Sequence, residues 1–184
     1  MSKFYITTPL YYVNDEPHIG HAYTTILADV ISRIRKIQKD DVYFLTGTDE
    51  HGQKVQEAAE KRNVSPKDHV DEYVKRFKNT WKKLNINYDC FIRTTDENHK
   101  NKVKDILSDL YKKGDIYFDE YEGLYSVSEE RFITEKEKEE GSFRQIKKIK
   151  EKNYFFKMSK YKSKLIEHIK SNDSFILPKS RRNE

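Results

Sequence analysis

Short strand-type runs alternate with longer helical patterns over residues 1–113, and this order leaves few folds open. Lys3–Thr8 is a β-type run, Val42–Leu45 is apolar without a break, and Phe91–Arg93 is a third strand candidate. An unbroken apolar run is typical of a parallel strand that is buried on both faces. Strand followed by helix, three times over, predicts an α/β fold with a doubly wound, Rossmann-like parallel sheet.

The helical patterns between these strands have recognisable ends. They cover residues 22–37, 53–62, 65–84 and 98–113, the first of them with apolar residues at amphipathic spacing. Ser65 followed by Pro66 is a helix start, with Ser65 as the N-cap. Gly114 ends the last helix.

The residue pattern changes after Gly114, so we predict one domain over residues 1–114 and a second over residues 115–184. Ile116–Val127 is rich in Tyr and Phe and is broken by Glu122-Gly123, which predicts a hairpin. The remaining segments are a charged helix or loop at 129–141, an aromatic strand within 146–158 and a helix at 161–170. The second domain is therefore expected to be a smaller α+β unit.

Composition excludes several classes of protein. Charged residues reach 36%, but 13% aromatic residues with only 6 Gly and 4 Pro argue against disorder. The single cysteine, Cys90, rules out a disulfide framework and a cysteine-rich zinc site within the chain. No run resembles a signal peptide or a membrane span, so we expect a cytoplasmic protein without a membrane partner.

The C-terminal part of the chain is basic. Residues 142–182 contain 13 Lys and Arg against 3 Asp and Glu. Such a segment can contact a polyanion such as tRNA. It is equally consistent with solvated, lysine-rich faces, and the sequence leaves both interpretations open.

The most informative motif is Pro17-His18-Ile19-Gly20-His21, between a polar turn and a long helical pattern. A helix N-terminus attracts phosphate through its backbone N–H groups and its dipole. Gly20 has no side chain and would let a nucleotide approach the backbone. His18 and His21 are three residues apart, so both imidazoles project from one helix face and could stabilise charge on transferring phosphates. Two exposed histidines on an ordinary first turn are the alternative.

Residues 7–21, TTPLYYVNDEPHIGH, resemble the first signature of the class I aminoacyl-tRNA synthetases. Residues 44–52, FLTGTDEHG, are similar to the methionyl-tRNA synthetase family in particular, as are 89–95, 114–125 and 153–156. The resemblance spans essentially the whole chain. It implies that residues 1–114 are the first half of a nucleotide-binding catalytic domain of the HIGH type. Residues 115–184 would be the N-terminal part of its connective-peptide insertion.

The resemblance also implies roles for individual residues. The ATP-binding positions are Asn14, His18, Gly20 and His21, of which His18 and His21 would be catalytic. The methionine-binding positions are Leu10, Tyr12 and Asp49, where the Asp49 carboxylate would pair with the methionine ammonium. Without the resemblance, an Asp in this setting is interpreted as an N-cap or turn residue, which is its common role there.

The reaction that the resemblance implies has two steps. ATP, with Mg²⁺, activates methionine to methionyl-adenylate, and the methionyl group is then transferred to tRNA(Met). No covalent enzyme nucleophile is required, so positioning and charge stabilisation would carry the catalysis.

Two features of the chain, its metal ligands and its length, depart from the family pattern. Many members carry a zinc knuckle of paired cysteines after the hairpin, whereas this chain has Ser126 and Glu129 there and no Cys in Gly141–Ile146. Since tight zinc binding needs thiolate or imidazole ligands, we predict no structural zinc. The family's catalytic domain is also longer than this chain, which we interpret as an N-terminal piece with little activity of its own.

Lys157-Met158-Ser159-Lys160 spells four residues of the family's second signature, whose lysine stabilises the transferring phosphates. In the family that loop follows the second half of the nucleotide fold. Here it follows the aromatic run of the insertion and precedes a short helix, so we predict that it has no catalytic role.

Other functions remain open from the sequence. Synthetases for isoleucine, valine or leucine share the histidine motif but differ in the residues before it. The cysteine enzyme has zinc-binding Cys near its first signature, and this chain has none there. A smaller nucleotidyltransferase would lack the similarity beyond residue 50. A non-catalytic tRNA-binding or truncated remnant is compatible with the basic segment at 142–182.

Overall fold

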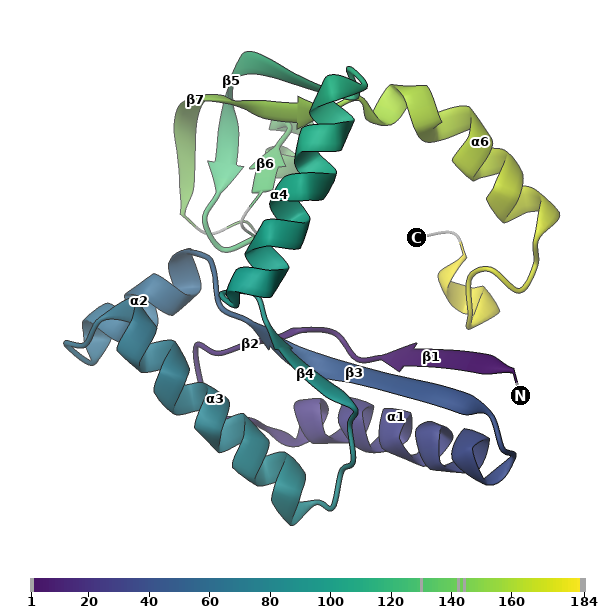
Figure 1. The fold of residues 1–184 in the computed structure, drawn as a ribbon. Coiled ribbons are helices and arrows are strands. Elements are labelled where there is room, and N and C mark those ends of the chain that lie inside the picture. The colour runs from purple at the N-terminus through teal and green to yellow at the C-terminus, as the bar shows by residue number, and fades with distance from the viewer. Residues whose placement is uncertain (1, 130, 142, 144, 183–184) are drawn as a thin grey trace. The chain divides into compact units, whose positions relative to one another are not determined.

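The computed structural model describes residues 2–129, 131–141, 143 and 145–182, and the chain divides into two compact units, Met1–Lys104 and Asp105–Glu184 (Figure 1). Helix α4 (Glu97–Lys112) spans this division. The boundary that we place at residue 114 lies just past the end of that helix, at a glycine with φ of 71°.

The first unit is built on a parallel sheet with β3 (Asp41–Asp49) at its centre. On β3 pair β1 (Lys3–Thr7), β2 (Tyr11–Tyr12) and β4 (Cys90–Arg93), all in parallel register. The predicted Rossmann-like parallel sheet is therefore confirmed. Strand β2 is not predicted from the sequence, because a strand of two residues is too short to show a strand-type residue pattern.

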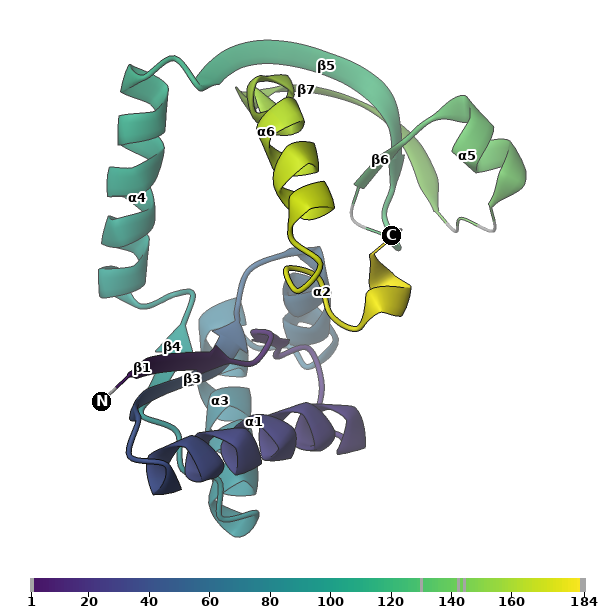
Figure 2. The same ribbon diagram turned by 90° about the vertical axis from the view of Figure 1, so that its right-hand side faces the viewer.

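Three helices accompany this sheet: α1 (Ile19–Ile37), α2 (Gln53–Lys61) and α3 (Pro66–Lys83). Figures 1 and 2 show α1 and α3 on the same face of the sheet. Phe44 from β3 and Phe77 and Trp81 from α3 are fully buried in the core at that face. The predicted N-cap is confirmed, because the Ser65 hydroxyl accepts the backbone N–H of Asp68 at 3.1 Å.

Helix α1 buries other residues than its apolar spacing suggests. Its buried positions are the small or polar Thr25, Ala28, Asp29 and Ser32. Most of its large apolar residues are exposed, namely Ile19, Tyr23, Ile26, Leu27, Val30, Ile34 and Ile37, whereas Ile31 is half-buried. Small side chains allow the helix to approach the sheet closely, and Asp29 is satisfied there by the Asn87 backbone N–H at 2.9 Å and by Arg33 at 2.6 Å.

The strands β3 and β4 approach each other unusually closely at Gly47. A Cβ atom at this position would lie 2.0 Å from the carbonyl oxygen of Ile92, its partner on β4. The close approach brings the end of β4 against the last residues of β3, where charged side chains gather.

The second unit is an antiparallel sheet with β5 (Ile116–Ser126) between β6 (Arg131–Ile133) and β7 (Ile146–Phe156). Its helices are α5 (Glu135–Glu140), α6 (Met158–Ser171) and a short 3₁₀ turn at Lys179–Arg181. The predicted aromatic strand and the helix after it are confirmed. Lys148 pairs with Glu122, and Lys150 and Lys152 pair with Glu120, across β5 and β7. We call these five residues the cross-strand charge ladder.

The hairpin predicted within residues 116–127 is wrong. Residues 116–126 form one continuous strand, which pairs with β6 and β7 instead of folding back on itself. Gly123 does not turn the chain, because it pairs in register with Ile149. Its lack of a side chain instead makes room for Tyr121, whose ring lies 2.7 Å from where a Cβ of Gly123 would be.

The charged segment at 129–141 contains both a strand and a helix. Helix α5 starts at a capping box in which Thr134 and Glu137 bond to each other's backbone N–H.

None of the helices in the described part of the chain combines the length and apolarity that a membrane crossing requires.

Candidate functional site

A pocket of about 420 Å³ lies in the first unit, where the chain passes from β2 to α1. It is lined by Leu10, Tyr11, Tyr12, Asn14, Asp15, Glu16, His18 and His21. Of the seven residues that the sequence singles out, five therefore share one pocket. Gly20 and Asp49 lie outside this lining.

The two histidines form the N-terminal cap of α1. His18 is the N-cap residue, and its Nδ1 accepts the backbone N–H of Gly20 at 3.1 Å. The Nδ1 of His21 accepts the backbone N–H of His18 at 3.2 Å, which completes a capping box made of two imidazoles. The rings stack with their centroids 3.7 Å apart. Gly20 permits this arrangement, since a Cβ there would lie 3.0 Å from the His18 ring.

This cap determines which nitrogen of each ring carries a proton. Because both Nδ1 atoms accept hydrogen bonds, each neutral imidazole carries its proton on Nε2. Each ring therefore offers one Nε2–H donor to a ligand. The sequence predicts N–H groups open to a phosphate at this helix start, but those of His18 and Gly20 are already bonded to the imidazole rings. The Nε2–H groups of His18 and His21 remain as donors.

An aromatic wall holds the second imidazole in place. The centroid of the His21 ring lies 4.7 Å from that of Tyr11 and 5.3 Å from that of Phe77. Tyr11 is fixed in turn by its hydroxyl, which is 2.8 Å from the Thr25 hydroxyl. Burial, and secondly the neighbouring charge of His18, lower the pKa of His21 below its ordinary value of 6.5.

This lowered pKa predicts how the first unit responds to acid. The native state binds fewer protons at His21 than the unfolded chain does, so stability falls as the pH drops below 6.5, until the native pKa is passed. Protonation of Nδ1 would also break the capping box. In an NMR titration we expect His21 to have a midpoint below 6.5 and the Nε2–H tautomer at pH 7.5. A His21 midpoint above 6.5, or an Nδ1–H tautomer, would contradict the described cap.

Helix α3 anchors the loop that carries Asn14. The buried His69 contacts the Val13 carbonyl through Nε2 at 2.8 Å and Arg62 through Nδ1 at 3.0 Å. Arg76 forms an ion pair with Glu16 on the same loop. The loop between β2 and α1 is thus held from both sides of Asn14.

Asp49 is the last residue of β3, and its register partner on β2 is Tyr12. Neighbouring strands lie about 4.8 Å apart, so the pairing brings two of the predicted methionine-binding residues next to each other. The Oδ1 of Asp49 accepts the Thr94 hydroxyl at 3.4 Å and the backbone N–H of His51 at 3.5 Å.

Sequence reasoning missed the residues behind Asp49. Glu50 is buried and accepts a bidentate ion pair from Arg93, which lies at the end of β4. Tyr11 and Phe77, whose rings pack against His21, were also not found from the sequence. A charged residue at the C-terminal end of each of two adjacent parallel strands was the available signal, because such strand ends meet at one edge of the sheet.

No group of three or more His, Cys, Asp or Glu that could hold a metal occurs in the described part of the chain. The position compared with the zinc knuckle has Ser126, whose hydroxyl lies 3.1 Å from that of Ser128 and accepts the Glu129 backbone N–H at 3.3 Å. The absence of structural zinc stays a prediction.

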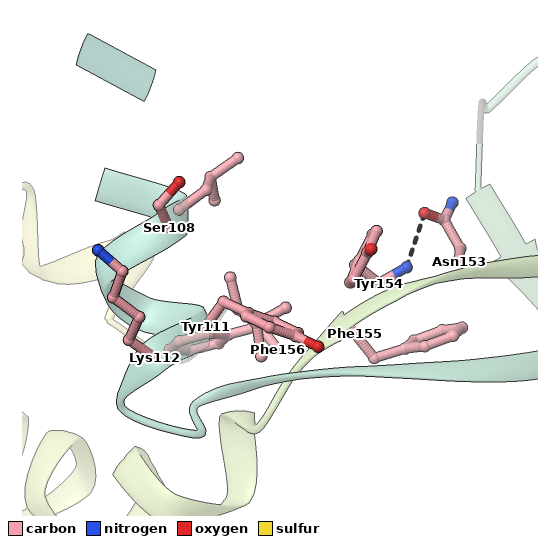
Figure 3. Close-up of a pocket in the computed structure, with 9 residues that line it drawn as sticks. Ser108, Tyr111, Lys112, Asn153, Tyr154, Phe155 and Phe156 are labelled. Carbon is pink, nitrogen blue, oxygen red and sulfur yellow. Dashed lines mark hydrogen bonds between the residues drawn. The ribbon is translucent and has the colours of Figure 1, made fainter. Parts of the chain in front are cut away.

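A larger hollow, of about 790 Å³, lies in the second unit and has a different character. Figure 3 shows Ser108, Tyr111 and Lys112 extending from α4, and Tyr154 and Phe156 from β7. The ring centroids of Tyr111 and Tyr154 are 5.9 Å apart and edge-on. Its lining is aromatic and aliphatic apart from Ser108, Lys112 and Asn153, and it includes none of the predicted site residues.

The segment Lys157–Lys160 is tied into the second unit. Lys160 forms an ion pair with Asp115, whose side chain is 3% exposed, and the Tyr161 hydroxyl donates to the same carboxylate at 2.6 Å. The backbone N–H of Lys157 donates to the Asp115 carbonyl at 2.8 Å. Lys160 is therefore occupied as a structural partner of a buried carboxylate.

Replacing both Lys157 and Lys160 with Met, in a protein of full length that carries this chain, is expected to change methionine-dependent pyrophosphate exchange less than about threefold. The reason is that Lys160 already serves Asp115. The same double variant should lower the unfolding temperature, since it leaves Asp115 buried with fewer partners. A loss of exchange of several hundredfold would contradict this assignment.

A parallel α/β sheet with a ligand pocket at a helix N-terminus and two imidazole donors beside it defines the class as a Rossmann-like nucleotide-binding domain. The model of the family described as tRNA synthetases class I (M) matches residues 4–142. The chain therefore belongs to the class I tRNA synthetases of this methionine family.

Individual relatives agree with this family. The chain is 50% identical to the methionine–tRNA ligase of Clostridium perfringens over 185 residues, covering 98% of the chain and 29% of the relative. Against the enzyme of Listeria monocytogenes it is 47% identical over 197 residues, covering 100% of the chain and 30% of the relative. The chain thus spans less than a third of these relatives.

A solved structure is similar as well. The methionyl-tRNA synthetase of Mycobacterium tuberculosis in complex with methionyl-adenylate superposes with a TM-score of 0.92 at 40% identity. The match covers 100% of this chain and 38% of that one. Together with the family match, it confirms the predicted fold class and the predicted family.

Proposed function

We propose that this chain contributes the first half of the catalytic site of a methionine–tRNA ligase, which activates methionine with ATP and transfers it to tRNA(Met). The observation that carries the proposal is the single pocket that Leu10, Tyr12, Asn14, His18 and His21 share at the N-terminus of α1. Family membership supports the same activity.

In this proposal the two imidazoles act on the triphosphate. His18 and His21 present Nε2–H donors from a rigid cap, so they need no rearrangement before they bond to phosphate oxygens. Such fixed donors stabilise the charge that develops as the methionine carboxylate attacks the α-phosphate and pyrophosphate leaves. The lowered pKa of His21 keeps that ring in its neutral, capping form at neutral pH.

The methionine would lie toward the end of β3. Leu10 and Tyr12 would receive its side chain and amino group, and the Asp49 carboxylate beside Tyr12 would pair with its ammonium. Asn14, held by the anchored loop, would face the nucleotide.

Magnesium would neutralise charge on the triphosphate when bound. It takes oxygen ligands and commonly binds substrate phosphates with one or two carboxylates. Asp15, whose carboxylate lines the same pocket, is a suitable donor, and its Oδ1 already accepts the Glu16 backbone N–H at 2.7 Å. The residues present therefore fit the ion, although they form no closed metal cage among the described residues.

The basic segment at 142–182 is the part of the chain whose charge would suit a tRNA partner. Several lysines of the basic segment are neutralised within the fold, since Lys148, Lys150 and Lys152 belong to the cross-strand charge ladder and Lys160 pairs with Asp115. This pairing favours the solvated-face interpretation over a polyanion-binding surface on β7.

The test is exchange of pyrophosphate into ATP by a protein of the relatives' length that carries this chain. We expect exchange that depends on methionine and not on isoleucine, valine or leucine. Residues 1–184 alone should exchange little, because all the residues that line the pocket come from the single segment 10–21. If another amino acid supports the exchange, methionine is not the substrate. If the longer protein shows no exchange with any amino acid, the non-catalytic alternative is favoured.

A further inference from the structure

Glu50 is the centre of a buried ionic network that no role proposed so far explains. Both of its carboxylate oxygens accept from Arg93, Oε1 from Nε at 2.7 Å and Oε2 from a terminal nitrogen at 2.9 Å. The Thr48 hydroxyl donates to Oε1 at 2.6 Å, and the Thr95 hydroxyl donates to Oε2. A buried carboxylate with this many donors is fully satisfied and rigid.

Arg93 extends the network to a third element. The guanidinium also donates to the Asp71 carboxylate on α3 at 2.6 Å, and these two carboxylates raise the pKa of Arg93. Lys67 and, secondly, Arg93 lower the pKa of Asp71. The network therefore connects the ends of β3 and β4 to α3, which fixes where the chain leaves β4.

The residue at that exit is Thr94, which lies between the network and Asp49. Its hydroxyl oxygen accepts the backbone N–H of Glu50 at 2.9 Å, and its own backbone N–H donates to the Thr48 carbonyl at 3.2 Å. A hydroxyl has a single proton to donate. With its oxygen accepting from Glu50, that proton is directed at Asp49 Oδ1, 3.4 Å away.

The Asp49 carboxylate is consequently held on one side only. Oδ1 receives the Thr94 hydroxyl and the His51 N–H, whereas Oδ2 has no hydrogen-bond partner among the residues that the structure describes. Both contacts to Oδ1 are long, as catalytic hydrogen bonds often are before a substrate binds. This arrangement leaves Oδ2 available to a cation while Oδ1 sets the orientation of the group.

We propose that Thr94 is a positioning residue for recognition of the substrate's ammonium group: its hydroxyl, which accepts the backbone N–H of Glu50, sets the orientation of the Asp49 carboxylate. The inference rests on the proposed function, since it takes the ammonium of an amino acid as the partner of Asp49. Thr94 itself does not contact the substrate.

The experiment compares three variants in a protein of the relatives' length that carries this chain. Thr94→Val keeps the shape and removes the hydroxyl, Thr94→Ser keeps the hydroxyl, and Thr95→Val removes a hydroxyl that bonds Glu50 but not Asp49. The measured quantities are the KM for methionine, the KM for ATP and kcat in pyrophosphate exchange, together with the unfolding temperature.

We expect Thr94→Val to raise the KM for methionine about 10-fold, roughly the effect of losing a hydrogen bond to a charged group. The KM for ATP should stay within about twofold, and Thr94→Ser should restore the KM for methionine. Thr95→Val should lower the unfolding temperature without this selective change. If both valine variants raise both KM values alike, Thr94 is only structural and the proposal is wrong.

A failure of this inference is separable from a failure of the proposed function. No methionine-dependent exchange by the unmodified protein overturns the function, whereas normal exchange with an unchanged KM for methionine in Thr94→Val overturns only the role of Thr94. If Thr94→Val does not fold, a crystal structure of the unmodified protein with methionine decides. The Thr94 hydroxyl should then lie within 3.2 Å of Asp49 Oδ1, and a hydroxyl turned away from Asp49 would contradict the proposal.

Discussion

Asp49→Asn is expected to lower kcat/KM for methionine about 10²- to 10³-fold in a protein of the relatives' length. The substitution preserves the shape of the side chain and its contacts with Thr94 and His51 but removes the charge. Losing one partner of a hydrogen-bonded charge pair costs about 3–4 kcal/mol, within the range measured for such pairs. The KM for ATP should change little, because Asp49 lies outside the histidine-lined pocket.

Asp41→Asn is the matched control. Asp41 is an exposed carboxylate on the same strand, at the opposite end of β3 from Asp49. The Asp41→Asn variant should leave the KM for methionine and the KM for ATP unchanged. A reduction of kcat/KM below about fivefold in Asp49→Asn would mean that Asp49 is a turn residue, which is the ordinary interpretation of an Asp after a strand.

Gly47→Ala is expected to destabilise the first unit by about 3 kcal/mol or more, at the upper end of the range for overpacked sites. The new Cβ would lie 2.0 Å from the carbonyl oxygen of Ile92 and 2.9 Å from its carbonyl carbon. Both are backbone atoms of β4, so no side-chain rotation relieves the overlap and the strand has to move. Chemical denaturation followed by the fluorescence of Trp81, which is fully buried and the only tryptophan, measures the effect.

Gly114→Ala separates this overlap from the general cost of replacing a glycine. Gly114 has a φ of 71° and nothing within 4 Å of the added Cβ, so only backbone strain opposes the substitution. We expect the free energy of unfolding to fall by about 1 kcal/mol. Denaturation monitored by circular dichroism measures this change. Equal losses in the two variants would show that the distance between β3 and β4 adapts.

The regular elements of the first unit could be predicted because their local signals agree with the fold. Ser65 and Pro66 mark the start of α3, and the apolar run at Val42–Leu45 lies in the central strand. The extent of β5 could not be predicted in this way. Gly123 reads as a turn in the sequence, but it faces the ring of Tyr121 within a strand, a contact that only the folded sheet creates.

Part of the candidate site could also be predicted, where its residues are close together in the sequence. His18 and His21 are three residues apart in the sequence, so their shared helix face follows from spacing. That their Nδ1 atoms cap the helix does not follow, because it depends on ring orientation. The grouping of Glu50, Arg93 and Thr94 depends on the pairing of β3 with β4, and 43 residues separate Glu50 from Arg93.

The Glu50–Arg93 ion pair and the cross-strand charge ladder differ in how strongly dissolved salt screens them. The Glu50–Arg93 pair is buried, with no exposure of the Glu50 side chain, so mobile ions screen it weakly. The cross-strand charge ladder on β5 and β7 is exposed to water, with side chains 38% to 70% exposed, and salt weakens such exposed pairs more than it weakens a buried pair. Raising the ionic strength should therefore loosen the second unit first and leave the carboxylate at the end of β3 where it is.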